Sequence, residues 1–197
     1  MTTLPDARTF LHAKIGEIIV AWNSVEYLAR NMLSHIAGGG PSALALTANL
    51  GNVAVKEGLD VLANEILTGS FQDHVFHFGK MFDCLREHRN WTVHGVIAIA
   101  KNSSGETIGI SQMESARSRL VLHQKHTTID ELEELLSHIK ALNLYGGNIL
   151  FSEDLTGIPQ ISAPRLSLLE KPPLPDRLQK PRLFLRDVKH PPESSPG

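Results

Sequence analysis

Apolar residues recur at spacings of three and four along much of the first 95 residues, a pattern typical of helices that bury one face. The longest stripe predicts a helix of about thirty residues that begins near Pro5 and ends before Gly38-Gly39-Gly40-Pro41. A capping box over Thr3–Asp6 would start it. Shorter helices are expected over about residues 42–50, 53–67 and 71–93. The predicted inward residues are Ile15, Ile18, Trp22, Val25, Ala29, Met32 and Ile36; Val55, Leu59, Leu62 and Ile66; and Phe71, Val75, Phe78, Phe82 and Leu85.

After Gly95 the pattern changes to β-branched segments over about residues 96–101, 106–113 and 118–126, which predict three strands. A last helix is expected to open at Thr128, where Glu131 completes a capping box, and to stop or kink at Tyr145-Gly146-Gly147. The predicted fold is mainly α: a helical bundle of four to five helices with a small inserted antiparallel β-meander and an extended C-terminal tail.

Proline and charge divide the chain near residue 156. Residues 157–197 hold nine of the eleven prolines, with seven Lys or Arg and four Asp or Glu, hence +3. Residues 1–156 have 12 basic and 17 acidic residues, hence −5. We therefore expect a folded, mildly acidic domain over 1–156 and a proline-rich basic tail over 157–197. Leu166, Leu168, Leu169 and the run Leu183-Phe184-Leu185 are apolar residues with which this tail could dock.

Composition excludes several classes of protein. No apolar run approaches a membrane span, and the first residues do not resemble a signal peptide. The single cysteine, Cys84, excludes an internal disulfide and a cysteine-based zinc site, so we expect a cytoplasmic protein. His74 and His77 share a helix face, but no third ligand joins them at helical spacing. Neither a metal nor another cofactor is expected.

Polar residues gather at the end of the predicted helix over 71–93, in the segment Leu85–Gly95. At about 100° per residue, Arg86, Asn90 and His94 lie within about 80° of one another and Arg89 lies about 60° to the other side. Two interpretations fit this cluster. The basic side chains stabilise the helix C-terminus through its dipole, or they form a functional polar site.

The segment Arg89-Asn90-Trp91-Thr92-Val93-His94, followed by Gly95, resembles the R-N-x-x-x-H-G form of the motif of HEPN domains. These are helical bundles, often dimeric, and many are metal-independent endoribonucleases. The family places this motif late in a long helix, and the long first helix with Trp22 and Glu26 is similar to its opening helix. The resemblance covers roughly residues 7–145.

The same chain holds further matches to the motif. Arg30-Asn31-Met32-Leu33-Ser34-His35 also has the R-N-x-x-x-H pattern, on the first predicted helix. Matches that start at Arg117 and Arg119 lie in predicted strands, whereas the family requires a helix. Helix end, trailing glycine and neighbouring polar residues favour Arg89 and His94, but the Arg30/His35 pair could still face the same cleft.

The resemblance implies an RNA-cleaving site in a homodimer, in a toxin or a defence effector. His94 would move protons, Arg89 would bind the scissile phosphate, and Asn90 would hold either group. Arg86, Trp91 and Glu26 are candidate binding residues. Glu26 would orient Arg86 or Arg89, or form a plain i,i+4 pair with Arg30.

The alternative is a non-catalytic helical module that binds a protein or nucleotide partner. Pro172, Pro175 and Arg177 fit a PxxPx[Arg/Lys] pattern, so the tail would serve as its docking segment.

Overall fold

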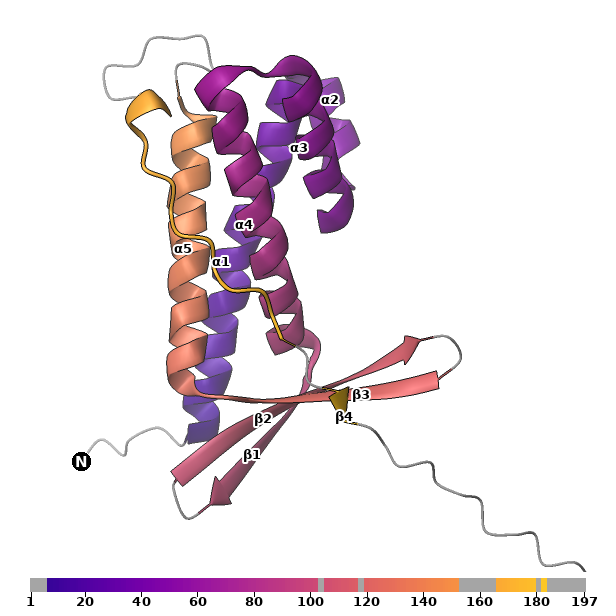
Figure 1. The fold of residues 1–197 in the computed structure, drawn as a ribbon, viewed down its shortest axis with the longest axis vertical. Helices are drawn as coiled ribbons and strands as arrows, with labels where there is room; N and C mark the ends of the chain where they lie inside the picture. The colour runs from indigo at the N-terminus through magenta and orange to yellow at the C-terminus, as the bar shows by residue number, and fades with distance from the viewer. Residues whose placement is uncertain (1–6, 103–104, 117–118, 153–165, 180–181, 184–197) are drawn as a thin grey trace, which may run out of the picture. The chain divides into compact units, whose positions relative to one another are not determined.

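The computed structural model describes residues 7–102, 105–116, 119–152, 166–179 and 182–183. It contains five α-helices, α1 (Ala7–Ile36), α2 (Gly40–Ala48), α3 (Asn52–Ile66), α4 (Gly69–His94) and α5 (Ile129–Leu150). A small antiparallel sheet stands between α4 and α5 in the chain (Figure 1). The mainly helical fold predicted from the apolar pattern is confirmed. The predicted capping box over Thr3–Asp6 lies outside the described residues.

The chain forms two compact units. The helical unit contains the described residues up to Val93 and those between Ile129 and Leu178. The sheet unit contains those of His94–Thr128 together with those that follow Leu178.

The helical unit is built around α1, which packs along α5, while α2 and α3 lie beside α1 (Figure 1). Its core is aromatic: Trp22 of α1 stacks on Phe82 of α4 with 5.1 Å between ring centroids, and Phe82 stacks on Phe78 at 6.2 Å. Most of the predicted inward residues are buried. On α3 the buried stripe differs from the prediction near the end of the helix, where Ala63 is buried and Ile66 is exposed.

The prediction that the last helix stops or kinks at Tyr145-Gly146-Gly147 was wrong. α5 continues through both glycines to Leu150, and Tyr145 is buried. A Cβ atom at Gly146 would lie 2.5 Å from Cε2 of Phe78, so this glycine admits the Phe78 ring of α4 into close contact with α5. Close packing between two helices, rather than a break, explains the glycine here.

The sheet unit is an antiparallel meander of β1 (Val96–Asn102), β2 (Gly105–Ala116) and β3 (Arg119–Thr127). Ile99 pairs with Ile108, and Ile110 pairs with Lys125. A two-residue strand, β4 (Arg182–Leu183), extends the sheet by pairing with β3, where Leu183 lies opposite Leu122. The three strands of the meander were predicted; β4 was not.

Part of the proline-rich tail belongs to the helical unit. A 3-10 turn, η1 (Leu166–Leu168), leads into an extended stretch through Leu178. We call residues 166–178 the strap. Figure 1 shows it following the length of the helical bundle. Extended chain was predicted here, but its seating on α4, described below, was not.

Candidate functional site

Arg86 is engaged by a carboxylate of its own helix. Its Nε and Nη2 atoms donate to Oδ1 of Asp83 at 3.2 and 2.7 Å, an i,i+3 ion pair whose partners are both partly exposed. The pair neutralises the Arg86 charge and fixes its guanidinium on the helix surface. Arg86, a candidate binding residue, is therefore paired with Asp83 and not oriented by Glu26.

Arg89 and Asn90 are joined to each other near the end of α4. Nη1 of Arg89 donates to Oδ1 of Asn90 at 3.1 Å, and both residues are half-buried. His94, the last residue of α4, is exposed. The bond brings together two of the three proposed catalytic side chains, and the third ends the same helix.

Trp91 is a core residue. It is 2% exposed, and its neighbour Thr92 is also buried, with its hydroxyl donating to the carbonyl of His88 at 3.0 Å. In this conformation Trp91 packs in the interior and does not offer a ring face to an RNA base.

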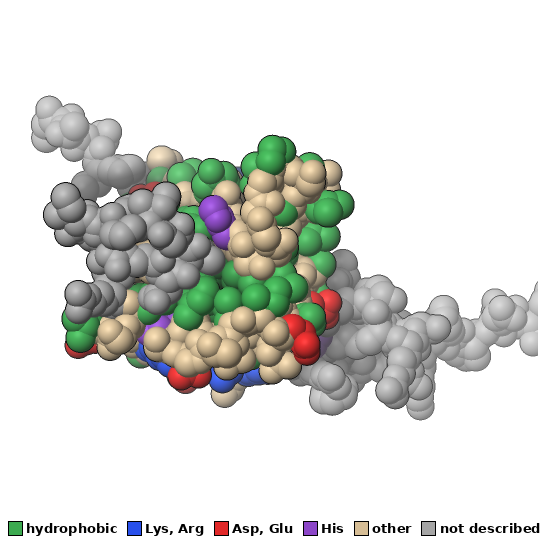
Figure 2. Space-filling model, turned by 90° about the horizontal axis from the view of Figure 1, so that it is seen from above, with side chains coloured by type: hydrophobic (Ala, Val, Ile, Leu, Met, Phe, Trp, Pro, Cys, Tyr) green, Lys and Arg blue, Asp and Glu red, His purple; other side chains and the backbone are tan. Residues whose placement is uncertain are grey.

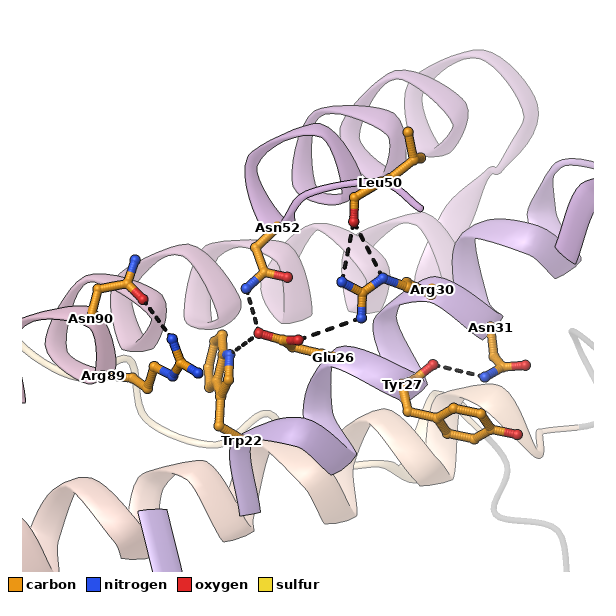
Figure 3. A network of polar contacts seen from close by, with 9 residues as sticks. All are labelled: Trp22, Glu26, Tyr27, Arg30, Asn31, Leu50, Asn52, Arg89 and Asn90. Atoms are coloured by element: carbon orange, nitrogen blue, oxygen red, sulfur yellow. Dashed lines mark hydrogen bonds and ion pairs between the residues drawn. The ribbon is translucent and has the colours of Figure 1, made fainter. Parts of the chain in front are cut away.

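Glu26 is the centre of a polar network between α1 and α3 (Figure 3). Its carboxylate accepts hydrogen bonds from Trp22 Nε1 and, at 2.6 Å, from Asn52 Nδ2. Arg30 Nη1 lies 3.5 Å from its second oxygen. The predicted i,i+4 pair between Glu26 and Arg30 is therefore confirmed.

Arg30 also ties α1 to the connection between α2 and α3. Its Nε and Nη2 atoms donate to the carbonyl of Leu50 at 3.3 and 3.1 Å (Figure 3). The neighbouring Asn31 donates to the carbonyl of Tyr27 at 2.8 Å. Arg30 and Asn31 of this match thus donate to backbone carbonyls, whereas His35 is exposed in the last turn of α1.

The sequence did not predict the row of side chains on α4 that holds the strap. Nε2 of His74, His77 and His88 bonds the carbonyls of Leu166, Pro172 and Asp176 at 2.8, 2.7 and 2.8 Å. Sγ of Cys84 donates toward the carbonyls of Pro175 and Asp176 at 3.4 and 3.3 Å. The signal available in the sequence was the recurrence of histidines on one helix together with a proline-rich segment elsewhere in the chain.

The hydrogen bonds of His74 define its tautomer. A carbonyl accepts at Nε2, so that nitrogen carries the proton, and Nδ1 is left to accept from the Tyr145 hydroxyl at 2.7 Å. Burial lowers the pKa of His74 and of His77, and the nearby Lys171 lowers both further. Burial raises the pKa of Tyr145. The three side chains therefore stay neutral beneath the strap at neutral pH.

Cys84 lies under the strap rather than at the centre of the bundle. It is half-buried, and burial followed by the charge of Glu87 raises the pKa of its thiol. The protonated thiol is the form that donates to the strap carbonyls.

Pro172 and Pro175, the two prolines of the PxxPx[Arg/Lys] pattern, are held against α4. The carbonyl of Pro172 accepts from His77 and that of Pro175 from Cys84, and both prolines are less exposed than Pro173, Leu174 and Arg177. In this arrangement the two prolines of the pattern already bind α4 of the same chain.

No family model, curated protein or solved structure matches this chain. Over the described ranges, no group of three His, Cys, Asp or Glu side chains is placed to hold a metal ion. None of the helices in those ranges is both long and apolar enough to cross a bilayer.

Proposed function

We propose that this protein is a HEPN-like, metal-independent endoribonuclease, a toxin or defence effector that acts as a homodimer. Arg89, Asn90 and His94 carry the reaction. The observation that carries the proposal is the 3.1 Å hydrogen bond from Arg89 to Asn90, because the asparagine of the motif itself positions its arginine.

The competing basic residues support this assignment. Arg86 is neutralised by Asp83, and Arg30 is committed to Leu50 and Glu26. The exposed imidazole of His94 can exchange protons with solvent and substrate. A guanidinium and an imidazole on one helix end are the groups that phosphodiester transfer requires when no metal takes part.

The proposed reaction is an internal transfer within RNA. One imidazole takes the proton of the ribose 2′-hydroxyl, whose oxygen attacks the phosphorus atom. The bond from phosphorus to the 5′-oxygen breaks, and a second imidazole protonates the leaving oxygen. Arg89 binds the non-bridging oxygens as their charge grows. The products are a 2′,3′-cyclic phosphate and a free 5′-hydroxyl, and the second imidazole is His94 of the other protomer.

The test is cleavage of a mixed panel of RNAs in the presence of EDTA. We expect His94→Ala and Arg89→Ala each to lower the rate by about 100-fold or more, which is the scale of a lost acid–base or electrostatic contribution. The 5′ fragments should end in a cyclic phosphate, which mass spectrometry of the products would detect.

His35→Ala is the matched control, because it removes an exposed histidine from the other R-N-x-x-x-H match. It should cleave like the unmodified protein. Equal cleavage by all three variants, or loss with His35→Ala alone, would contradict the proposal.

A second function, a helical interaction module for a protein or nucleotide partner, is favoured by the inverted pattern of α2. Leu46 is 76% exposed and Leu44 is also exposed, whereas Thr47 is buried. Hydrophobic side chains also gather on the end of the bundle seen in Figure 2, with few charged ones among them. Partner capture that required residues 157–197, together with a His94→Ala variant that captured the partner and treated RNA as the unmodified protein does, would replace the first function with this second one.

A further inference from the structure

The strap presents a backbone rich in acceptors. Its prolines, Pro172, Pro173 and Pro175, have carbonyl groups but no N–H. Within the strap, the Leu169 N–H donates to the Leu166 carbonyl in η1. Beyond this turn, an extended proline-rich chain makes no hydrogen bonds within itself, so its carbonyls remain open to outside donors. The strap therefore needs a surface that supplies N–H or S–H groups.

The strap face of α4 supplies donors of this kind. The three imidazole N–H groups of His74, His77 and His88 and the thiol of Cys84 reach the carbonyls of four strap residues. Each of these bonds ends on the main chain of the strap and none on a strap side chain. The contact thus recognises an extended backbone and tolerates changes in the outward side chains.

Burial along the strap repeats every three residues. Leu166, Leu169, Pro172, Pro175 and Leu178 are each less exposed than the residues between them. The first step of this repeat lies in the 3-10 turn η1. Beyond η1, three residues per turn is the repeat of a polyproline II helix, so Leu169, Pro172, Pro175 and Leu178 lie on one edge of such a helix. A preformed polyproline helix loses little conformational entropy on docking, which favours its use as a ligand.

One end of the strap is anchored more deeply than the rest. Leu166 is 1% exposed, and its carbonyl completes the chain of hydrogen bonds from Tyr145 through His74. Beyond it, the strap is held by separate bonds at His77, Cys84 and His88. A deeply buried leucine at the first position, and leucine or proline at the later positions of the register, are the features that this face selects.

We propose that the strap face of α4 is a binding site for extended proline-rich peptides. The strap fills the site within its own chain, and a proline-rich peptide from another chain with the same three-residue register binds there in its place. This inference does not depend on the proposed nuclease activity, because it uses a different part of α4.

The test uses a fluorescent peptide with the sequence of residues 166–179 and the full-length protein. Leu166→Asp places a charge in the buried anchor and releases the strap, so we expect the peptide to bind this variant about tenfold more tightly than the unmodified protein, whose site is occupied. Adding His77→Ala and His88→Ala to this variant should weaken binding again. Fluorescence polarisation measures all three affinities.

The control peptide has the same composition, with the prolines at positions 172 and 175 moved out of register. Binding of this control as tight as that of the strap peptide would overturn the proposal. So would the absence of strap-peptide binding to a Leu166→Asp protein that keeps its helical circular dichroism.

A second measurement uses the unmodified protein and does not depend on how Leu166→Asp folds. An excess of unlabelled strap peptide should displace the strap and speed amide hydrogen exchange at Leu169, whose N–H donates to the carbonyl of Leu166 at 3.1 Å. The out-of-register peptide should not. Exchange that stays unchanged with the strap peptide would overturn the proposal.

Discussion

The two segments with the R-N-x-x-x-H pattern have the same motif residues and different surroundings. On α1, the Arg30 guanidinium bonds the carbonyl of Leu50 and pairs with Glu26, deep in a network that joins two helices. On α4, Arg89 bonds the asparagine of its own motif, and the histidine that follows is exposed at the helix end.

The difference shows that a short motif acquires its meaning from the acceptors around it. The Arg30 guanidinium donates to the carbonyl of Leu50, which follows α2, and pairs with the partly buried carboxylate of Glu26, so its donors stabilise the fold. Such bonds hold a guanidinium in place and leave less of it for a ligand. Arg89 bonds the asparagine of its own motif, and this is why we place the proposed chemistry there.

The largest expected effect on stability is at Arg30. Arg30→Ala removes both donors to Leu50 and leaves Glu26 without its cation, so we expect the free energy of unfolding to fall by about 2 kcal/mol. His35→Ala, at the exposed end of the same segment, should change it by less than about 0.5 kcal/mol. Urea unfolding with unchanged m-values would measure both. Equal effects would remove the structural distinction between the two segments.

The apolar periodicity was sufficient to predict the fold, because burial of one helix face dominates its energetics. Trp22, Phe78, Phe82 and Leu85 were all placed inward and are fully buried. The three strands of the meander followed from their β-branched segments. The fourth, β4, could not be predicted, since a two-residue strand at Arg182 and Leu183 depends on an edge of β3 that is distant in sequence.

The candidate site was predictable only in its residue types. Spacing placed Arg86, Arg89 and Asn90 on neighbouring parts of one helix, but it could not tell which guanidinium is neutralised by Asp83 and which bonds Asn90. The docking of the strap on α4 could not be predicted for the same reason. The bond from His88 to Asp176 joins residues 88 positions apart, and no local pattern encodes that pairing.

Gly146 and Gly147 offer a second pair of like residues in unlike surroundings. An added Cβ at Gly146 meets the Phe78 ring, so Gly146→Ala should destabilise the protein by about 1.5 kcal/mol through overpacking. Gly147 has nothing within 4 Å of its Cβ position and lies inside α5, where alanine is the better helix former. Gly147→Ala should therefore stabilise by about 0.5–1 kcal/mol. Thermal unfolding of both variants checks the signs, and a shared sign would contradict the packing at Gly146.

The smallest expected effect is a pH dependence of stability. It comes from His74 and His77, which lie beneath the strap on α4, whereas His94 of the same helix is exposed. Burial lowers the pKa of both strap histidines below the ordinary value of 6.5. As pH falls through 6.5, the unfolded chain takes up protons at these positions before the folded chain does. The stability they contribute is therefore complete above pH 6.5 and is lost as pH falls toward their lowered folded-state pKa values.

His77→Gln tests this pH dependence, because glutamine keeps an N–H donor for the carbonyl of Pro172 but does not titrate. The groups that face the two histidines are Tyr145 of α5, Lys171 of the strap, and Asp73 and Lys80 of α4. Between pH 7.5 and pH 5.5 the urea midpoint should fall further for the unmodified protein than for His77→Gln. The same variant should cleave RNA at the unmodified rate, because His77 is not part of the proposed catalytic set. Equal losses of stability in the two proteins would show that docking of the strap does not depend on a neutral His77.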